Sequence, residues 1–454
     1  MSSALVGRTG TRSCAPVGRH GGHRAPWVSP PVRRPVIGPA ATDREISAES
    51  RAARRRMAAR SAAGERDVAP AAAVRGSDQA GMFRSIPIID LSRLRESNAG
   101  QRAALLSELR EVCHTVGFMY VTNHGVGDEV CARALQAAGS FFALPQDAKM
   151  AIHHSSSPAF RGYIAKAAEN TGGLADLREQ VEFGVESEAV RGPEAGTMAG
   201  VFPVYRRLIG PNQWPDEALV SGFRGAIEAF MEGMHTLSLD LMGALMEALY
   251  LPANALDDTI GDTPNMQMKI ARYPPPQTED QLAGSKYGVG PHTDSGYLSI
   301  LLQDAVGGLQ VRNGAGQWVD APPVPGALVV NLGEMLQLAS AGFYLATEHR
   351  VQPPPAGGPA RLSVPYFFNP KLDAQISALQ LPSSLEWARP PPASLSESST
   401  HAGRNKLLSQ YGDNAFKSLA RSHPAVLAAH HPDLEISKEG LVQPRAGAAH
   451  QAAL

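Results

Sequence analysis

The segment from residue 262 to residue 372 most constrains the fold, because it reads as a succession of short strands separated by Gly/Pro turns. Many short apolar runs divided by turn residues are typical of an antiparallel sandwich or barrel. We therefore expect this segment to form a β-sandwich or a β-barrel. The expected strands carry the runs MQMKIARY, YLSILLQ, LQVR, QWVDA, ALVVNL, YLATEHRV and RLSVPYFF.

The sequence on either side of this segment contains apolar residues at helical spacing, so we expect a mixed α and β fold. The N-terminal part differs, because it is rich in Arg, Gly and Pro, has no sustained apolar period and has the composition of a disordered arm or a targeting segment. The parts expected around the strand-rich segment are an extension at 1–81, a mixed helix and strand region at 82–215, a long helical segment at 216–255, a helical cap at 373–440 and a disordered tail at 441–454.

The charge of the chain gives no reason to expect DNA or an acidic membrane as a partner, because the formal net charge is −1 over 454 residues. No uninterrupted apolar run is long enough to span a bilayer. The three cysteines, Cys14, Cys113 and Cys131, argue against a disulfide framework and against a Cys-based metal site. We expect a monomer in a reducing compartment, with the cytoplasm favoured and a plastid or mitochondrion left open by the Arg-rich N-terminus.

The run GVGPHTDSGYLSILLQD, residues 288–304, places a histidine and an aspartate just before apolar residues. In a strand, residues i and i+2 face the same side, so His292 and Asp294 can direct an imidazole and a carboxylate at one metal ion. His349, in a later expected strand, can supply a third ligand. Two histidines and one carboxylate, with the other positions open, form the facial triad of non-haem Fe(II) oxygenases. A lone histidine is more often a packed or surface residue, so the interpretation of His349 depends on the next expected strand.

That strand carries a guanidinium and a hydroxyl on one face, at Arg361 and Ser363. An arginine can bind a carboxylate through two N–H groups, and a neighbouring serine can add a hydroxyl donor. Such a clamp near an iron site suits a cosubstrate with a carboxylate at each end. In isolation, a surface arginine beside a serine would be the simpler interpretation.

A second His-x-Asp pair occurs at His431 and Asp433. Pro432 between them is incompatible with a regular strand, and no Arg-x-Ser sequence comes after them. Only His450 lies beyond the pair, in a tail of low complexity. We therefore expect no metal site there.

Taken together, these motifs resemble a known family. The run from PHTDSGYLSILLQD to TEHRV, followed by RLSVPYFFNP, resembles the catalytic domain of the isopenicillin N synthase-like, plant-type 2-oxoglutarate- and Fe(II)-dependent dioxygenases. IPIIDL, GFMYVTNHGV and SFFALPQDAK resemble the N-terminal leader domain of the same family, which would be the region 82–215. The resemblance covers roughly Ile86 to His431 and implies a double-stranded β-helix, or jelly roll, with flanking helices.

The resemblance also implies roles for individual residues. These roles are iron ligation by His292, Asp294 and His349, binding of the distal carboxylate of 2-oxoglutarate by Arg361 and Ser363, and a hydrogen bond to this cosubstrate from Tyr273. Plant members usually carry Asn two residues before that tyrosine, whereas Ala271 stands here, so one cosubstrate contact departs from the family pattern. The implied cofactors are Fe(II), 2-oxoglutarate and O₂, with ascorbate as the reductant in vitro.

The implied activity is oxidation of an unactivated C–H bond of a small organic metabolite, by hydroxylation, desaturation or ring closure, with release of succinate and CO₂. An iron-dependent oxidase of the same family, with the same ligands and Arg-x-Ser but no use of 2-oxoglutarate, is an alternative that sequence motifs do not separate, whereas succinate formation does. A non-catalytic ligand-binding protein and a zinc hydrolase are further alternatives, opposed by the intact ligand set and by the Arg-x-Ser clamp. The sequence does not name the substrate, and Phe118, Tyr163 and Phe368 are its candidate neighbours.

Overall fold

A computed structural model describes most of the chain from residue 82 onward. The described residues are 82–95, 98–171, 174–192, 197–276, 287–386 and 407–445. The extension predicted at 1–81 and the tail from residue 446 lie outside them. Strand β16 (Val442–Pro444) pairs with β15 (Leu434–Ile436), so regular structure continues beyond the predicted start of the tail at residue 441.

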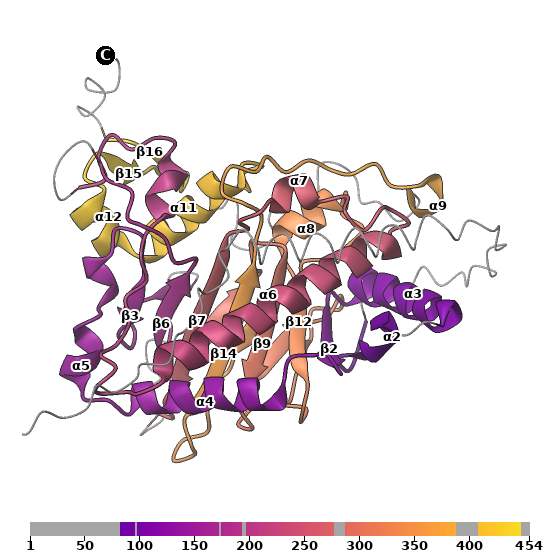
Figure 1. The fold of residues 1–454 in the computed structure, drawn as a ribbon, viewed down its shortest axis with the longest axis horizontal. Coiled ribbons are helices and arrows are strands. Elements are labelled where there is room, and N and C mark those ends of the chain that lie inside the picture. Colours follow the sequence, from indigo (N-terminus) through magenta and orange to yellow (C-terminus); the bar gives the residue numbers. More distant parts are fainter. Residues whose placement is uncertain are drawn as a thin grey trace, which may run out of the picture. The chain divides into compact units, whose positions relative to one another are not determined.

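Eight strands form one mixed sheet, the large sheet (Figure 1). β1 and β2 run parallel, and the other pairs in this sheet are antiparallel. The strand order is β1 (Ile88–Asp90), β2 (Phe118–Thr122), β12 (Leu328–Leu332), β9 (Leu298–Gln303), β14 (Arg361–Phe368), β7 (Met266–Tyr273), β6 (Glu179–Gly184) and β3 (Gly162–Ile164). The predicted leader region contributes β1, β2, β3 and β6, so it shares one sheet with the strands of the barrel.

Four further strands form an antiparallel small sheet. Their order is β11 (Trp318–Asp320), β10 (Leu309–Arg312), β13 (His349–Val351) and β8 (Val289–His292). From β7 to β14 the chain passes repeatedly between the large and the small sheet, and both sheets line one cavity. This arrangement confirms the double-stranded β-helix expected from the sequence.

The side chains of β7, β9 and β14 alternate between the two faces of the large sheet. Odd-numbered residues, among them Tyr273, Leu301 and Arg361, line the cavity between the sheets. Even-numbered residues such as Ile300 and Tyr366 are fully buried on the other face. The strand period therefore decides which side chains reach the site.

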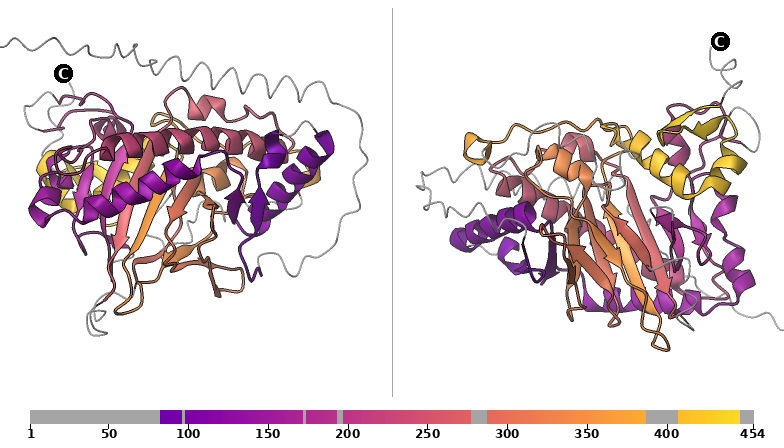
Figure 2. Two further views of the ribbon diagram at one scale, coloured as in Figure 1. Left: turned by 60° about the horizontal axis from the view of Figure 1, so that its bottom comes forward. Right: turned by 180° about the vertical axis from the view of Figure 1, so that it is seen from behind.

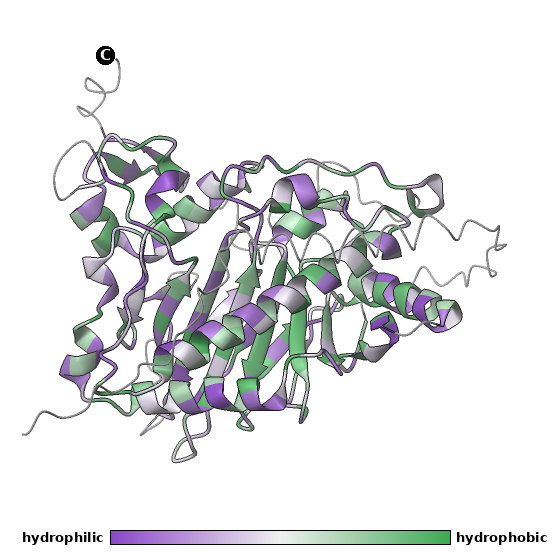
Figure 3. Ribbon diagram, in the orientation of Figure 1, coloured by the Kyte–Doolittle hydropathy of each residue, from purple (hydrophilic) through white to green (hydrophobic). Residues whose placement is uncertain are grey.

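Helices cover that second face of the large sheet. α6 (Phe223–Ala248) and α4 (Asp128–Phe142) pack against each other and against β14, and α3 (Ala99–Thr115) packs on α6 (Figure 2). The segment predicted at 216–255 thus holds one continuous helix that begins at Phe223. Met234 on α6 is fully buried in the core beneath the helix. The strands beneath these helices are mainly hydrophobic (Figure 3).

The remaining elements are short. They are α2 (Ser92–Arg95), α5 (Gln146–Met150), η1 (His154–Ser156), β4 (Asn170–Thr171), β5 (Leu174–Ala175), η2 (Val204–Leu208), α7 (Asp257–Ile260), α8 (Glu334–Ala339), α9 (Ser383–Glu386), α11 (Tyr411–Ser422) and α12 (Pro424–His430). α11 packs on η2 and α12 and borders the cavity. Within the described part of the chain, no helix combines the length and apolar character needed to cross a bilayer.

Candidate active site

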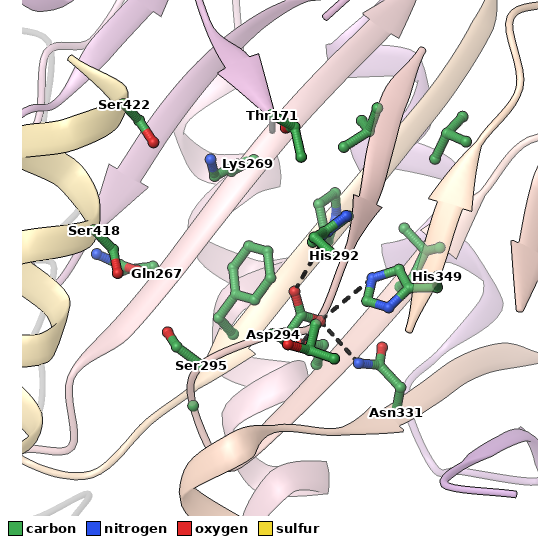
Figure 4. Close-up of a pocket in the computed structure, with 18 of the residues that line it drawn as sticks. Thr171, Gln267, Lys269, His292, Asp294, Ser295, Asn331, His349, Ser418 and Ser422 are labelled. Carbon is green, nitrogen blue, oxygen red and sulfur yellow. Dashed lines mark hydrogen bonds and ion pairs between the residues drawn. The ribbon is translucent and has the colours of Figure 1, made fainter. Parts of the chain in front are cut away.

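Three predicted ligands meet at the rim of the small sheet (Figure 4). His292, the last residue of β8, is the register partner of His349, the first residue of β13. The Nε2 atoms of His292 and His349 lie 3.8 Å from Oδ1 and Oδ2 of Asp294, respectively. One potential ligand atom from each residue lies within 4.8 Å of the other two, so the structure brings the predicted triad together.

The local structure around the triad differs from the sequence-based prediction. Asp294 does not share a strand with His292, because β8 ends at His292 and Asp294 lies in the connection to β9. The backbone carbonyl of Asp294 accepts a hydrogen bond from the Glu334 amide at 2.8 Å, which fixes this connection on the start of α8. The predicted strand YLATEHRV likewise begins only at His349. The chain crosses between the sheets at Asp294, and this crossing interrupts the expected strand.

Hydrogen bonds orient each member of the triad. Nδ1 of His292 lies 2.8 Å from the Gly290 carbonyl, and Nδ1 of His349 lies 3.2 Å from the Thr347 carbonyl. An N–H bond from Nδ1 to a carbonyl leaves Nε2 as the lone-pair donor, which is the usual arrangement of a metal-binding histidine. The donor atoms therefore fit a metal ion with two nitrogen ligands and one oxygen ligand.

Two polar residues that the sequence did not reveal hold the aspartate. Asn331 on β12 donates to Asp294 Oδ2 at 2.8 Å, and the Ser299 hydroxyl on β9 donates to the same oxygen at 2.5 Å. Both donors come from the large sheet, so they tie the crossing segment to the strands behind it. Asn331 lies inside the apolar run ALVVNL, and its position in an otherwise hydrophobic strand is the one signal that could have identified it.

The electrostatics of the site favour neutral histidines and an ionised aspartate. Burial, reinforced by the neighbouring His349, lowers the pKa of His292 to about 4. Burial by itself raises the pKa of Asp294, but the facing histidines outweigh it and hold this pKa below its ordinary value. Metal ions bind the deprotonated forms of both residue types, so the ligands are ready for a metal at neutral pH.

The predicted carboxylate clamp lies in the same cavity. Arg361 and Ser363, on the inward face of β14, are only 1% and 2% exposed. Nη2 of Arg361 donates to Gln303 Oε1 at 3.2 Å, whereas Nε and Nη1 have no hydrogen-bond partner among the described residues. Leaving buried N–H donors of a charged group unpaired is unfavourable. A ligand carboxylate would satisfy them.

Tyr273 completes this end of the cavity. It is the register partner of Arg361 in the pair β7–β14, and its ring lies beneath the guanidinium. Ala271, where the family pattern has Asn, is the register partner of Ser363. The ring of Tyr273 therefore supports the clamp directly.

The cavity has a volume of about 720 Å³ and contains the triad, the clamp and Tyr273 in its lining. Phe118 lines it as expected, and its ring packs edge-on against His349. The other two candidate substrate neighbours do not belong to the lining. Tyr163 donates to Glu179 at 2.7 Å outside the cavity, and Phe368 points to the opposite face of β14 because its residue number has the other parity.

The second His-x-Asp pair does not form a metal site. Nε2 of His431 lies 3.0 Å from the Pro158 carbonyl. The carboxylate of Asp433 accepts two hydrogen bonds of 2.7 Å from Arg207. The two side chains thus contribute to the packing of the C-terminal cap.

Comparisons with known proteins agree with this geometry. Residues 86–217 match the family model for the N-terminal region of the non-haem dioxygenase in morphine synthesis, and residues 264–370 match the 2OG-Fe(II) oxygenase superfamily. A 2-oxoglutarate-dependent dioxygenase of Gibberella zeae is 33% identical over 78% of this chain and 92% of its own length. One from Dothideomycetidae sp. is 36% identical over 67% of this chain and 79% of its own length.

A solved structure shows the same fold. The crystal structure of a full-length Neurospora crassa protein in complex with alpha-KG has a TM-score of 0.58 and 26% identity, covering 74% of this chain and 96% of that chain. A chain with this fold, these relatives and this ligand set is a non-haem iron enzyme, and it belongs to the 2-oxoglutarate- and Fe(II)-dependent dioxygenases.

Proposed function

We propose that His292, Asp294 and His349 hold the Fe(II), and that Arg361 and Ser363 bind the distal carboxylate of 2-oxoglutarate. The observation that carries this proposal is the Arg361 guanidinium, which is buried, short of partners and directed into the cavity that contains the triad. A dicarboxylate with a keto-acid end can engage both sites at once. The two ends of the cosubstrate then fix its orientation.

When bound, iron couples the oxidative decarboxylation of 2-oxoglutarate by O₂ to the oxidation of a substrate C–H bond. The residues of the chain position the reactants and keep water away. Asn331 and Ser299 restrain the Asp294 carboxylate, so the ligand set keeps its geometry. Val289 and Val351 in the lining shield the clamp from solvent and strengthen its electrostatic interaction with a carboxylate.

The substrate in this proposal is a small organic metabolite, and the outcome is hydroxylation, desaturation or ring closure. A cavity of about 720 Å³ is in the range of small-molecule sites. A protein that must enclose one small molecule needs no second subunit. We therefore expect a monomer, which gel filtration coupled to light scattering will test.

The rival reaction is that of an iron-dependent oxidase that uses no 2-oxoglutarate. The Arg361 clamp favours the 2-oxoglutarate reaction, because an oxidase without this cosubstrate would leave Nε and Nη1 of the buried guanidinium without a partner among the described residues. The test is an anaerobic titration of the Fe(II) protein with 2-oxoglutarate, followed by succinate release after O₂ is admitted. Formation of the visible absorption band of the chelate and of succinate is expected. O₂ consumption without either would favour the oxidase.

A further inference from the structure

The cavity that contains the triad and the clamp also has a charged wall, which reaches the clamp end where Arg178 contacts Tyr273. On the inward face of β7, Lys269 and Gln267 lie four and six residues before Tyr273. Glu182 on β6 is the register partner of Lys269 and also lines the cavity. Figure 4 shows Lys269 and Gln267 bordering the same space as the triad.

These residues belong to one hydrogen-bonded network. Nζ of Lys269 lies 2.8 Å from Glu182 Oε1 and 3.4 Å from Glu169 Oε1. Glu169 Oε2 accepts from Arg178 Nη2 at 2.7 Å and from Gln180 at 2.8 Å. We call Glu169, Arg178, Glu182 and Lys269 the charged wall. All four side chains line the cavity, and none is more than 19% exposed.

The charged wall is not a second metal centre, although Glu169, Glu182 and His423 place potential ligand atoms within 4.8 Å of one another. The ammonium of Lys269 already bridges the two carboxylates. A divalent cation between them would also face the guanidinium of Arg178. The like charges would oppose its binding, so the network serves a different ligand.

Stability alone is a weak reason for such a network. Replacing a buried ion pair with well-packed apolar residues is often neutral or stabilising. The wall also faces further polar groups, because Ser418 and Ser422 on α11 border the cavity opposite Lys269 (Figure 4). The wall itself contains two cations and two carboxylates, and Asp176 adds a third carboxylate 3.3 Å from Nη2 of Arg178. The wall therefore offers both hydrogen-bond donors and hydrogen-bond acceptors.

We propose that the substrate is a small, polar, nitrogen-containing molecule that carries N–H donors together with carbonyl or carboxylate acceptors. This inference rests on the proposed function and specifies its substrate class. The N–H groups would donate to the carboxylates of Glu169 and Glu182, and the acceptors would take hydrogen bonds from Lys269 and Gln267. A substrate with an apolar body would displace water from the charged wall without forming hydrogen bonds in its place, which is unfavourable.

The test compares two sets of compounds on the Fe(II)–2-oxoglutarate protein. The first set is the proteinogenic amino acids and the nucleobases, and the second is fatty acids, phenylpropanoids and terpenoid acids. Binding is read under anaerobic conditions as a change in the absorption band of the chelate, and turnover is read as stimulated succinate release. We expect the strongest binders and stimulators in the first set.

Variants connect the selected compound to the charged wall. Lys269→Met and Glu182→Gln should each weaken binding of the best compound by about 10- to 100-fold, because each removes a hydrogen bond to a charged group. The 2-oxoglutarate band should persist in both. The control is Lys149→Met, because Lys149 forms a similarly buried pair with Glu179 at 2.8 Å outside the cavity lining. It should leave compound binding unchanged.

The inference is overturned if the best compound belongs to the second set, or if no member of the first set changes the band. Equal losses in Lys149→Met and Lys269→Met would also overturn it, because they would show a general effect on folding. If Lys269→Met fails to fold, Glu182→Gln, which preserves shape, gives the answer. If the wild-type protein shows no Fe(II)–2-oxoglutarate band, the result overturns the proposed function together with this inference.

Discussion

Tyr273 and Arg361 face each other across the antiparallel pair β7–β14, and the guanidinium carbon of Arg361 lies 4.9 Å from the centroid of the Tyr273 ring. The ring supports the planar cation from one side through a cation–π contact. Gln303 accepts a hydrogen bond from Nη2 of the guanidinium, whereas Nε and Nη1 have no hydrogen-bond partner among the described residues. The guanidinium is thus held in place before a ligand arrives, which favours tight binding of a carboxylate.

Arg361→Ala should weaken the binding of 2-oxoglutarate by about 100-fold. Removing one partner of a buried charge pair costs about 3–5 kcal/mol, and chelation of iron by the keto-acid end offsets part of this loss. Arg361→Lys should recover some affinity, because the charge survives without the planar fork. The measurement is an anaerobic titration of the chelate band.

A matched control for this variant is Arg350→Ala. Arg350 also stacks on an aromatic ring, 4.0 Å from the centroid of Trp318, but it does not line the cavity. It should leave the affinity for 2-oxoglutarate unchanged. Wild-type affinity in Arg361→Ala, or an equal loss in Arg350→Ala, would contradict the clamp.

Asp294→Ala should abolish iron binding, because it removes the only oxygen ligand of the triad. Asp433→Asn should retain iron, since the Asp433 carboxylate is engaged by the buried Arg207. This second variant should instead lower the melting temperature. Iron content by mass spectrometry and thermal unfolding separate the two effects. Retention of stoichiometric iron by Asp294→Ala would show that the ligand assignment is wrong.

Asn331→Ala should weaken metal binding without removing a ligand. Residues that hydrogen-bond to metal ligands typically change affinity by about 10- to 100-fold when they are mutated. Asn331 donates to Asp294 Oδ2, so its loss should leave Ser299 as the remaining side-chain donor and hold the carboxylate less firmly. The measurement is competitive titration with Fe(II) or Mn(II) under anaerobic conditions. Asn265→Ala is the control, because this buried amide donates to Tyr411 and not to a member of the triad, and it should leave the affinity intact.

Strand periodicity explains why much of the site could be predicted. The alternation of side chains placed Arg361 and Ser363 on one face, and the structure has both in the cavity. The same rule, extended along β7 from Tyr273, would have identified Lys269 and Gln267 as cavity residues. The sequence offered this signal, although the site prediction stopped at the tyrosine.

Other features depend on contacts that no local pattern encodes. Asn331 and Ser299 reach Asp294 only because β12 and β9 are neighbours in the large sheet with a particular register. Glu169 does not lie in a long strand, so strand periodicity cannot place its side chain. Its approach to Lys269 follows from tertiary packing alone. The interruption of the strand at Asp294 arises in the same way, from the crossing between two sheets.

The C-terminal cap should loosen as the pH falls from about 6.5 towards 4. His154, His423 and His431 are buried where η1 meets α11 and α12, and the rings of His154 and His423 are in contact. Burial lowers the pKa of His154 to about 3, of His431 to about 4, and of His423 below its usual value. His154 and His431 are therefore neutral in the folded protein over most of this range, and His423 is harder to protonate in the folded protein than in the unfolded chain.

The sign of the effect follows from proton linkage. The unfolded chain binds protons at these histidines near pH 6.5, whereas the folded chain does not, so the free energy of unfolding decreases as the pH falls through this window. The carboxylate of Glu169, which faces His423, favours the protonated form of this histidine and so reduces the loss of stability at low pH. Urea unfolding between pH 7.5 and pH 5 should show this loss. His154→Leu removes one of the titrating groups, so its stability should depend less steeply on pH than that of the wild type. The same slope in both proteins would show that His154 does not contribute to the acid sensitivity of the cap.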